Sequence, residues 1–373
     1  MREIGIGVIG WGFMGKTHTH ALREMPLFYR GANFVPVLKC VCSGHIENAV
    51  EAAKLGGFES WAGDYRELLK RSDIEVVSIC SPNSLHAEMA VEALENGKHV
   101  YIDKPLAMNA REARLIADAA KKNGRLLQVA NNNRFFPSTM LAKKLIDEGR
   151  VGDILSFRFK YLHSGSIDPN RPIGWKQTGE GGVLLDLGSH ALDMLMHLCG
   201  NVRSVCCDMR VLYPKRPDGS GGFTSDVSED QVSALVKLEN GALGHVEASK
   251  IATGTDDELS FEIEGIKGAI RWSLMDANYL YYYDNEQNPG EYGGNMGFTR
   301  IACVARFNPP GGKFLPIKNT IGWDRAHMHC YYSFLDAIVN SRPVSPDAEE
   351  ALRLQIVMDA MKTSDAERRW VDI

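Results

Sequence analysis

The chain has 373 residues, and its 42 basic and 47 acidic side chains give a net charge of -5. Such a length exceeds what one hydrophobic core usually supports, so two domains are expected in a chain that is 44% hydrophobic and 24% charged. Charges of both signs are interspersed without long runs of one sign, which argues against nucleic-acid and anionic-membrane partners.

The sequence also lacks the marks of secretion or membrane insertion. Its eight cysteines show neither CxxC spacing nor a secretory disulfide framework, and Met1-Arg2-Glu3 leads directly into a strand-like run. The most apolar later stretch, 183–199, contains two aspartates and two histidines, which is unlike a membrane span. We therefore expect a cytoplasmic protein with reduced thiols.

The first part of the chain alternates strand and helix patterns. Strands are predicted at 4–9, 36–42, 75–80, 99–102 and 126–130, and helices from about residue 14 and at 46–54, 64–71, 85–95 and 110–122. Strands this apolar are buried on both faces, and their alternation with helices predicts a parallel, doubly wound α/β sheet. Residues 1–131 are thus expected to form a dinucleotide-binding Rossmann domain.

After residue 131 the pattern changes. A helix at 138–148 precedes period-two segments at 154–163, 202–213, 231–238, 242–251, 259–264, 269–272 and 279–283, and helices at 328–340 and 348–364 follow. Turns at 239–241 and 265–268 join neighbouring strands, which indicates antiparallel pairing. Residues 132–373 are predicted to form an α+β domain for substrate binding and oligomerisation, with a large, mostly antiparallel open sheet and helix 348–364 packed back on the first domain.

A glycine-rich loop lies between the first strand and the first helix. Gly10, Gly12 and Gly15 form G-x-G-x-x-G there, with Trp11, Phe13 and Met14 between them. The first glycine lets the chain turn sharply, the second admits a pyrophosphate close to the backbone, and the third lets the helix pack on the strand. Because the flanking strand and helix agree with the motif, it predicts dinucleotide binding.

The end of the second strand should carry an acid that binds the ribose diol of NAD and repels the phosphate of NADP. Ser43 and His45 occupy this region instead. The absence of a phosphate-binding arginine favours NAD, and NADP is not excluded. Ser81-Pro82-Asn83 ends a later strand, where Asn83 has two readings, contact with the nicotinamide ribose or a helix cap.

Asp103-Lys104-Pro105 follows the strand-like run 98–102. A lysine beyond a buried parallel strand lies at the ligand-binding edge of such a sheet. Lys-Pro is also a common surface dipeptide, but the upstream phosphate loop favours a functional lysine. Its positive charge would stabilise an alkoxide that develops on a reacting hydroxyl.

Asp186 and His190 lead into a helical pattern. If the helix is already established at Asp186, the two residues lie one turn apart and face the same side. A neutral histidine is a suitable base for removing the hydroxyl proton while hydride leaves the same carbon. Two alternatives remain open, a histidine that is only a satisfied core residue and a divalent metal pair. No third ligand with suitable spacing lies nearby, so no metal is predicted.

Together these motifs resemble the glucose-fructose oxidoreductase, inositol dehydrogenase and MocA family over essentially the whole chain. The resemblance rests on the phosphate loop, on Ser81-Pro82-Asn83 with His86, on Asp103-Lys104-Pro105, on the segment 181–190 with Asp193, and on the turn 240–242. It implies that Lys104, Asp186 and His190 are catalytic and that His86 and Asp103 lie at the cofactor. Two departures are Asp103 in place of the usual glutamate and Ser43 in place of the usual acid.

The resemblance also implies a substrate class and an assembly. Family members act on a ring carbon of sugars and cyclitols and form dimers or tetramers, so a polyol, sugar or glycoside substrate and a homodimer or homotetramer are expected. An insertion at 288–323, with Phe314-Leu315-Pro316, resembles branches that act on glucosides, anhydrosugars or inositols. Possible substrate contacts, besides Lys104, Asp186 and His190, are Tyr161, His163, Trp175, Lys176, Arg300 and His327.

The leading interpretation is an NAD(P)-dependent dehydrogenase that oxidises a ring secondary hydroxyl of a glycoside or another sugar, with an inositol 2-dehydrogenase close behind. A second enzymatic reading keeps NAD tightly bound and uses transient oxidation for glycoside elimination or epimerisation. A cofactor-binding sensor without chemistry would predict loss of Lys104 or His190, and both are present.

Overall fold

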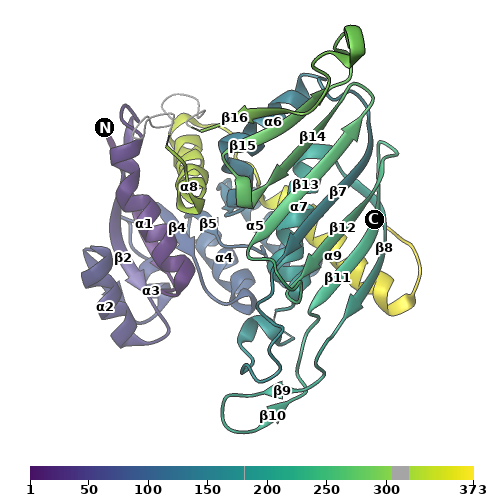
Figure 1. Ribbon diagram of the computed structural model, residues 1–373. Helices are drawn as coiled ribbons and strands as arrows, with labels where there is room; N and C mark the ends of the chain where they lie inside the picture. Colours follow the sequence, from purple (N-terminus) through teal and green to yellow (C-terminus); the bar gives the residue numbers. More distant parts are fainter. Residues whose placement is uncertain (180, 305–318) are drawn as a thin grey trace. The chain divides into compact units, whose positions relative to one another are not determined.

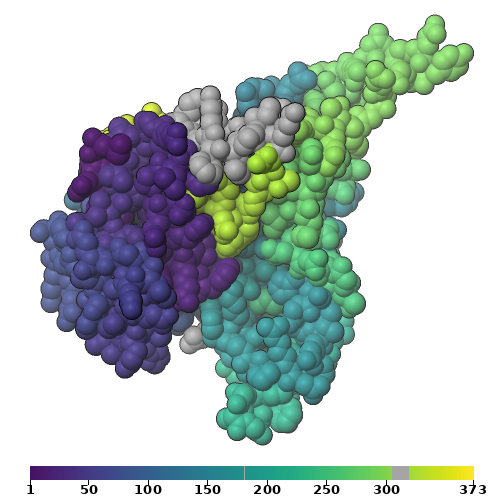
Figure 2. All heavy atoms as spheres, turned by 60° about the vertical axis from the view of Figure 1, so that its left-hand side comes forward, coloured from purple at the N-terminus to yellow at the C-terminus, as the bar shows by residue number. Residues whose placement is uncertain are grey.

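The computed structural model describes residues 1–179, 181–304 and 319–373. Contacts between residues divide the chain into two compact units, coloured along the sequence in Figures 1 and 2. Unit 1 is Met1–Phe135 with the described part of a C-terminal segment that ends at Gln355, and unit 2 is Phe136–Val304 with Ile356–Ile373. The division into domains after residue 131 stays a prediction, and the motif at 314–316 lies outside the described residues.

Unit 1 contains a six-stranded sheet with the order β3-β2-β1-β4-β5-β6, and all of its pairs are parallel. The strands are β1 (Arg2–Ile9), β2 (Phe34–Cys42), β3 (Ser60–Ala62), β4 (Val76–Ile79), β5 (His99–Ile102) and β6 (Leu127–Val129). This order confirms the predicted doubly wound sheet. The strand order reverses between β1 and β4, and ligands of such sheets bind where this reversal occurs.

Helices surround this sheet. They are α1 (Phe13–Phe28), α2 (Ile46–Gly56), α3 (Tyr65–Leu69), α4 (His86–Glu95), α5 (Ala110–Asn123) and α8 (Trp323–Asn340). Ile4, Ile6 and Val8 of β1 are completely buried in a core that also includes Leu22 of α1 and Phe334 of α8. Helix α8 thus completes the core of unit 1, although it lies some three hundred residues after β1 in the sequence.

Unit 2 contains a nine-stranded sheet with the order β16-β15-β14-β13-β7-β12-β11-β8-β17. Its strands from β7 to β16 are drawn in teal to green in Figure 1. The strands are β7 (Ile154–Leu162), β8 (Val202–Arg210), β11 (Gln231–Leu238), β12 (Leu243–Ser249), β13 (Glu258–Gly265), β14 (Gly268–Ser273), β15 (Tyr279–Asp284), β16 (Thr299–Ala302) and β17 (Val371–Asp372). Only β7 and β12 pair in parallel among the described strands of this sheet. The predicted large, mostly antiparallel sheet is confirmed.

Helices α6 (Pro137–Asp147) and α7 (Ser189–Cys199) lie on one face of this sheet, as Figure 1 shows. Phe157, Phe159 and Tyr161 alternate along β7 toward that face and are buried. A small hairpin of β9 (Arg216–Pro217) and β10 (Phe223–Thr224) lies apart from the sheet in Figure 1. Helix α9 (Ala348–Glu367) begins in unit 1 and continues into unit 2.

The other face of the large sheet is strongly charged. Arg158 of β7 pairs with Glu264 of β13 at 2.6 Å, and Lys160 pairs with Glu258 at 3.0 Å. A sheet face that exposed apolar side chains to solvent would favour assembly with a second copy. Cross-strand ion pairs occupy this face instead, so any oligomer that uses it would be built on polar contacts.

None of the helices in the described parts of the chain has the length and apolar composition needed to cross a membrane.

Candidate active site

The glycine-rich loop connects β1 to α1 and fits a dinucleotide closely. A Cβ atom on Gly10, whose φ is +100°, would lie 2.5 Å from the carbonyl oxygen of Cys80, and one on Gly15 would lie 2.0 Å from the carbonyl oxygen of Gly10. The same atom on Gly12 would meet nothing within 4 Å. The chain is therefore tightly packed at the first and third glycines and open at the second, where a pyrophosphate must approach.

The start of α1 offers hydrogen-bond donors to such a group. Gly12 is the N-cap and provides no side chain to satisfy the first N–H groups of the helix. Trp11 Nε1 and Ser81 Oγ are also buried without a hydrogen-bond partner among the described residues. Phe13 is exposed and stacks on Trp323 at 5.7 Å between ring centroids, while Met14 is half-buried. These features fit NAD bound across the loop.

The end of β2 carries no carboxylate in the described structure. Ser43 follows Cys42 and is half-buried, and His45 is exposed and forms the N-cap of α2 without a side-chain cap. Ser43 is therefore placed where the second strand ends, as the sequence predicted. Its contact with the ribose stays a prediction.

The ends of β4 and β5 are adjacent, because Ile79 pairs with Ile102 in the parallel register. Asp103 accepts a hydrogen bond from the backbone N–H of Lys104 at 2.9 Å, and both residues are half-buried at this edge. Since Ile9 also pairs with Ile79, the glycine loop, Ser81 and Lys104 all begin at the same edge of the sheet.

His86 connects the two loops at that edge. Its Nδ1 lies 2.9 Å from the carbonyl oxygen of Pro105, and its Nε2 lies 3.1 Å from the carbonyl oxygen of Ser81. Burial lowers the pKa of His86, so the ring is neutral and donates to only one of these two acceptors at a time. His86 thus acts by holding the loops together. Asn83 is buried and caps neither of the adjacent helices, so the capping alternative does not apply.

A buried aromatic and polar cluster lies behind this edge. His18 Nδ1 is 2.9 Å from Ser78 Oγ and 3.1 Å from Cys80 Sγ, and its ring contacts Tyr101 at 5.1 Å between centroids. Burial lowers the pKa of His18 to about 4. His327 is also buried, with its ring 4.1 Å from that of Trp323. The structure therefore places His327 inside the packing of unit 1, and its contact with a polyol stays a prediction.

In unit 2 the predicted pair Asp186 and His190 lies where a π-helical turn passes into an α-helix. Leu184–Gly188 forms a π-helical turn that leads into α7, and Ser189 Oγ donates to the carbonyl oxygen of Leu185 at 2.7 Å. Asp186 lies in this wide turn and His190 in the first turn of α7. Helical geometry is thus established by Asp186, which is the condition on which the one-turn spacing depended. Turns of this kind occur frequently at functional sites.

The carboxylate of Asp186 is held between two lysines. Lys176 Nζ lies 2.9 Å from Oδ1, and Lys250 Nζ lies 3.1 Å from Oδ2. Sequence reasoning placed Lys176 near the substrate but missed Lys250, which follows the end of β12. No local motif marks it, and its position beside Asp186 depends on the parallel pairing of β12 with β7.

Aromatic and imidazole groups complete this part of unit 2. The rings of Tyr161 and His190 meet edge to face at 5.6 Å between centroids, and both are buried. His163 Nδ1 accepts from the N–H of Gly165 at 3.0 Å, so its neutral form carries the proton on Nε2. Burial, followed by the charge of Lys250, lowers the pKa of His163. Tyr161, His163, Asp186 and His190 are thus brought together.

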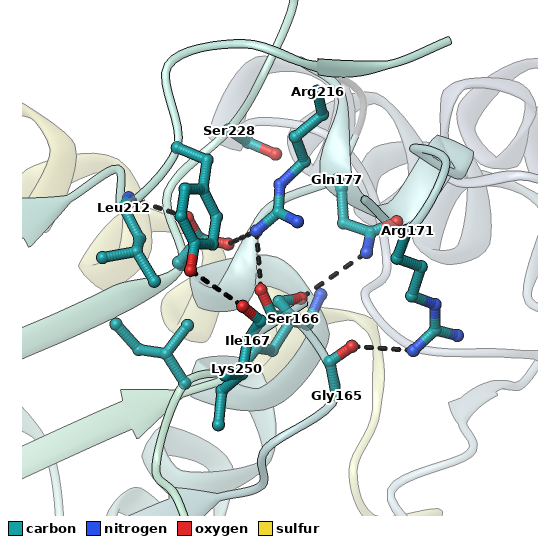
Figure 3. Close-up of polar contacts among 12 residues, drawn as sticks. Gly165, Ser166, Ile167, Arg171, Gln177, Leu212, Arg216, Ser228 and Lys250 are labelled. Carbon is teal, nitrogen blue, oxygen red and sulfur yellow. Dashed lines mark hydrogen bonds and ion pairs between the residues drawn. The ribbon is translucent and has the colours of Figure 1, made fainter. Parts of the chain in front are cut away.

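The segment 163–178, which carries His163, Trp175 and Lys176, is anchored to the rest of unit 2 by a buried arginine (Figure 3). Arg216 donates to the carbonyl oxygens of Ser166 at 2.8 Å and Asp168 at 3.3 Å, and it pairs with Asp230 at 3.1 Å. The ion pair is almost completely buried, with side-chain exposures of 2% and 5%. Tyr213 Oη adds a hydrogen bond to the carbonyl oxygen of Ile167 at 2.8 Å.

Trp175 and Arg300 have different surroundings. Trp175 is exposed and lies beside Lys176, whose Nζ is 5.7 Å from the ring centroid. Arg300 is on β16, where it stacks over Tyr279 at 3.4 Å and pairs with Asp276 at 3.5 Å. Strand β16 lies four strand positions from β7, or about 19 Å at the usual strand spacing. The structure therefore does not bring Arg300 to Asp186, and its substrate contact stays a prediction.

No group of three or more metal-binding side chains occurs within residues 1–179, 181–304 and 319–373.

Comparison with known proteins identifies the chain's relatives. A family model described as oxidoreductase family, NAD-binding Rossmann fold matches residues 4–131, and a GFO/IDH/MocA C-terminal domain model matches residues 139–271. Levoglucosan dehydrogenase of Pseudarthrobacter phenanthrenivorans is 35% identical over 391 aligned positions, which cover 100% of this chain and 99% of that protein. The scyllo-inositol 2-dehydrogenase (NAD(+)) of Bacillus subtilis is 30% identical and covers 72% of this chain and 73% of its own length.

A solved structure of levoglucosan dehydrogenase has a similar fold over the whole chain. Levoglucosan dehydrogenase in complex with NADH and levoglucosan superposes with a TM-score of 0.92 at 34% identity and covers 100% of both chains. Since the Rossmann fold of the matching family is the fold of unit 1, the protein is an NAD-dependent oxidoreductase that acts on CH–OH groups. The chain belongs to the GFO/IDH/MocA oxidoreductase family.

Proposed function

We propose that the protein oxidises a ring secondary hydroxyl of a pyranose that is held as an anhydrosugar or glycoside. The observation that carries this choice of substrate is the alignment with levoglucosan dehydrogenase, which is 35% identical and extends over the whole chain. The scyllo-inositol dehydrogenase match covers only 72% of the chain. Fold alone does not select a substrate, so the site residues must carry the chemistry.

The reaction removes a hydride from the carbon and a proton from its hydroxyl. Bound NAD supplies the hydride acceptor, and the protein must therefore supply a base and hold the hydroxyl in place. His190 is the proposed base, because it is a histidine on the first turn of α7 beside Asp186. The buried ring of Tyr161 packs against it and limits the orientations that it can adopt.

Asp186 is proposed to accept a hydrogen bond from a second hydroxyl of the substrate. Its carboxylate is 13% exposed, which leaves it reachable by a polyol yet largely shielded from water. Neighbouring hydroxyls of a pyranose or cyclitol are the donors that such an acceptor recognises. This contact would fix which ring carbon faces the nicotinamide.

Lys104 is proposed to act on the same oxygen as His190. It lies at the ligand-binding edge of the unit 1 sheet, directly after β5. An ammonium group there would stabilise negative charge that develops on the hydroxyl oxygen as its proton leaves. This assignment comes from the sequence motif and from the position of Lys104 in unit 1.

An inositol is the second candidate substrate, because scyllo-inositol 2-dehydrogenase is 30% identical to this chain. Inositols and pyranosides both present rows of ring hydroxyls, so the same Asp186 and His190 would serve either. A third reading, with tightly held NAD and no net redox change, predicts oxidation of at most one equivalent of substrate per enzyme.

One experiment separates these readings. Purified protein with excess NAD is mixed in turn with levoglucosan, methyl glucosides, and myo- and scyllo-inositol, and the absorbance of reduced nicotinamide is followed. Continuous NADH formation with the anhydrosugar or a glucoside, and slower rates with inositols, is the expected result. Turnover only with inositols would replace the first proposal by the second, and a single burst without turnover would favour the third.

We also infer a cytoplasmic homodimer or homotetramer. Helices α6 and α7 lie on one face of the nine-stranded sheet, and the cross-strand ion pairs of the other face give a surface that a second copy could match with its own charges. Light scattering at micromolar protein measures the assembly, and a monomeric mass would contradict the inference. Such an interface should weaken as salt is added.

A further inference from the structure

The two lysines that bind Asp186 differ sharply in their surroundings. The Lys250 side chain is 5% exposed, whereas that of Lys176 is 50% exposed. Lys250 also donates to the carbonyl oxygen of Lys176 at 3.3 Å, so its ammonium group contacts both the carboxylate and the backbone that carries the second lysine. Lys250 is therefore a fixed partner of Oδ2, and Lys176 is a solvent-facing partner of Oδ1.

Backbone contacts hold Lys250 in place on both sides. Its N–H donates to the carbonyl oxygen of Asp230 at 2.9 Å, and its carbonyl oxygen accepts from Ser166 at 2.8 Å. Asp230 is the buried partner of Arg216, and Ser166 is one of the residues whose carbonyl Arg216 binds (Figure 3). The ammonium group of Lys250 thus extends from a rigid region, which restricts where it can place its charge.

The charged and titratable groups around Asp186 identify Lys250 as its main buried counterion. Lys176 lies in the segment before the π-helical turn, and Lys250 follows the end of β12. Tyr161 and His163, at the end of β7, interact electrostatically with the same carboxylate. Asp257 acts on both Tyr161 and His163 and contributes negative charge. A buried carboxylate stays charged only where a compensating positive charge lies close to it.

We propose that Lys250 is a positioning residue for the substrate-binding carboxylate: it anchors Oδ2 of Asp186 and keeps the group ionised, so that Oδ1 is the oxygen that accepts the substrate hydroxyl. Lys176 then occupies Oδ1 until substrate arrives and is displaced by it. Exposed ion pairs of this kind are weak and exchange readily, whereas a buried pair does not. The proposal rests on the role of Asp186 given under the proposed function.

The first test compares Lys250→Met with the wild-type enzyme. Methionine has a similar length and no charge, so Asp186 loses its buried lysine and keeps the solvent-exposed one. We expect kcat/KM for the best substrate of the panel to fall about 10- to 100-fold, and the acid limb of its pH profile to move up by about one pH unit, in the range of shifts that a nearby opposite charge produces. NADH affinity should stay unchanged, because the phosphate loop lies in unit 1.

Two matched lysine variants sharpen this test. Lys176→Met removes the other lysine of the same carboxylate and should move the acid limb of the pH profile by less than Lys250→Met does, as expected for an exposed pair. Lys160→Met removes a lysine paired with Glu258 on the charged face of β7, and it should leave kcat/KM unchanged. An acid limb shifted equally by Lys176→Met and Lys250→Met would overturn the asymmetry between the two oxygens.

A double-mutant cycle with Asp186→Asn separates positioning from general structural support. If Lys250 acts through the carboxylate, Lys250→Met should cost less than about twofold in kcat/KM when added to Asp186→Asn. The double variant removes both charges of the Asp186–Lys250 pair, so it should fold even where Lys250→Met alone does not. An equal cost of Lys250→Met in both backgrounds would overturn the proposal.

The outcomes distinguish this proposal from the proposed function. Normal activity of Asp186→Asn would show that substrate binding does not need the ionised carboxylate of Asp186, which removes the proposed role of this carboxylate and the role of Lys250 with it. If Asp186→Asn lowers kcat/KM while Lys250→Met keeps the wild-type kcat/KM and pH profile, the assignment of the site stands. That result would overturn only the role of Lys250.

Discussion

The glycine loop offers a clean separation of cofactor binding from folding. A Cβ on Gly12 would meet nothing within 4 Å, and the φ of Gly12 is -75°, which any residue adopts. Gly12→Ala should therefore cost only about 1 kcal/mol of unfolding free energy or less, as for an alanine at a helix N-cap. The new methyl group points to where the pyrophosphate must approach, so NADH affinity should fall at least about 100-fold, or about 2.7 kcal/mol.

Gly15→Ala is the matched variant, and it should lower the stability of the fold more than Gly12→Ala does. Its Cβ would lie 2.0 Å from the carbonyl oxygen of Gly10, so β1 and α1 must move apart. Overpacking of this kind costs about 1–3 kcal/mol or more, and Tm should fall by several degrees. Thermal unfolding without cofactor and fluorescence titration with NADH measure the two effects. Wild-type NADH affinity in Gly12→Ala, or an unchanged Tm in Gly15→Ala, would refute the reasoning.

Three further predictions concern the cofactor, the chemistry and pH. Ser43→Asp should increase the preference for NAD over NADP, and unchanged discrimination in kinetics with both cofactors would show that residue 43 does not face the ribose. His190→Ala should lower turnover about 10²–10⁴-fold with NADH affinity retained, and Lys104→Ala should be at least as damaging; near-normal steady-state rates would assign either residue a structural role. Burial lowers the pKa of His18 from 6.5 to about 4, so the unfolded chain binds a proton that the folded chain excludes. The contribution of His18 to the free energy of unfolding is therefore fully present above pH 6.5 and is lost toward pH 4 at up to about 1.4 kcal/mol per pH unit. Denaturation of His18→Gln at several pH values should show a shallower loss of stability than the wild-type protein shows.

Local patterns were sufficient for much of the fold and for part of the site. The order of strands and helices in unit 1 follows from apolar runs separated by helical periods, and Gly10, Gly12 and Gly15 lie where strand meets helix. The spacing of Asp186 and His190 is local to one helix start, so it could be interpreted without a structure. The short strands β3 and β17 were not predicted, because two or three residues carry no periodic signal.

Long-range pairing limited the rest. Lys250 was missed because it becomes a partner of Asp186 only when β12 lies parallel to β7, and hairpin turns predict only antiparallel neighbours. Arg300 was included because an arginine in an insertion suits a polyol, yet its contacts with Tyr279 and Asp276 belong to the sheet edge. Helix α8 begins at Trp323, five residues before the predicted start, and Trp323 packs there on Phe13 and His327. The contact with Phe13 is long-range and leaves no sign in the local sequence pattern.

The anchoring of the segment 163–178 has a consequence for how such enzymes change substrate. Arg216 and Tyr213 bind the backbone carbonyls of Ser166, Ile167 and Asp168, and every amino acid offers the same carbonyl. At these three residues the course of the segment is therefore held through groups that no replacement of residues 166–168 removes. Replacements of residues 166–168 should therefore change the side chains that the segment displays while these backbone contacts keep its course.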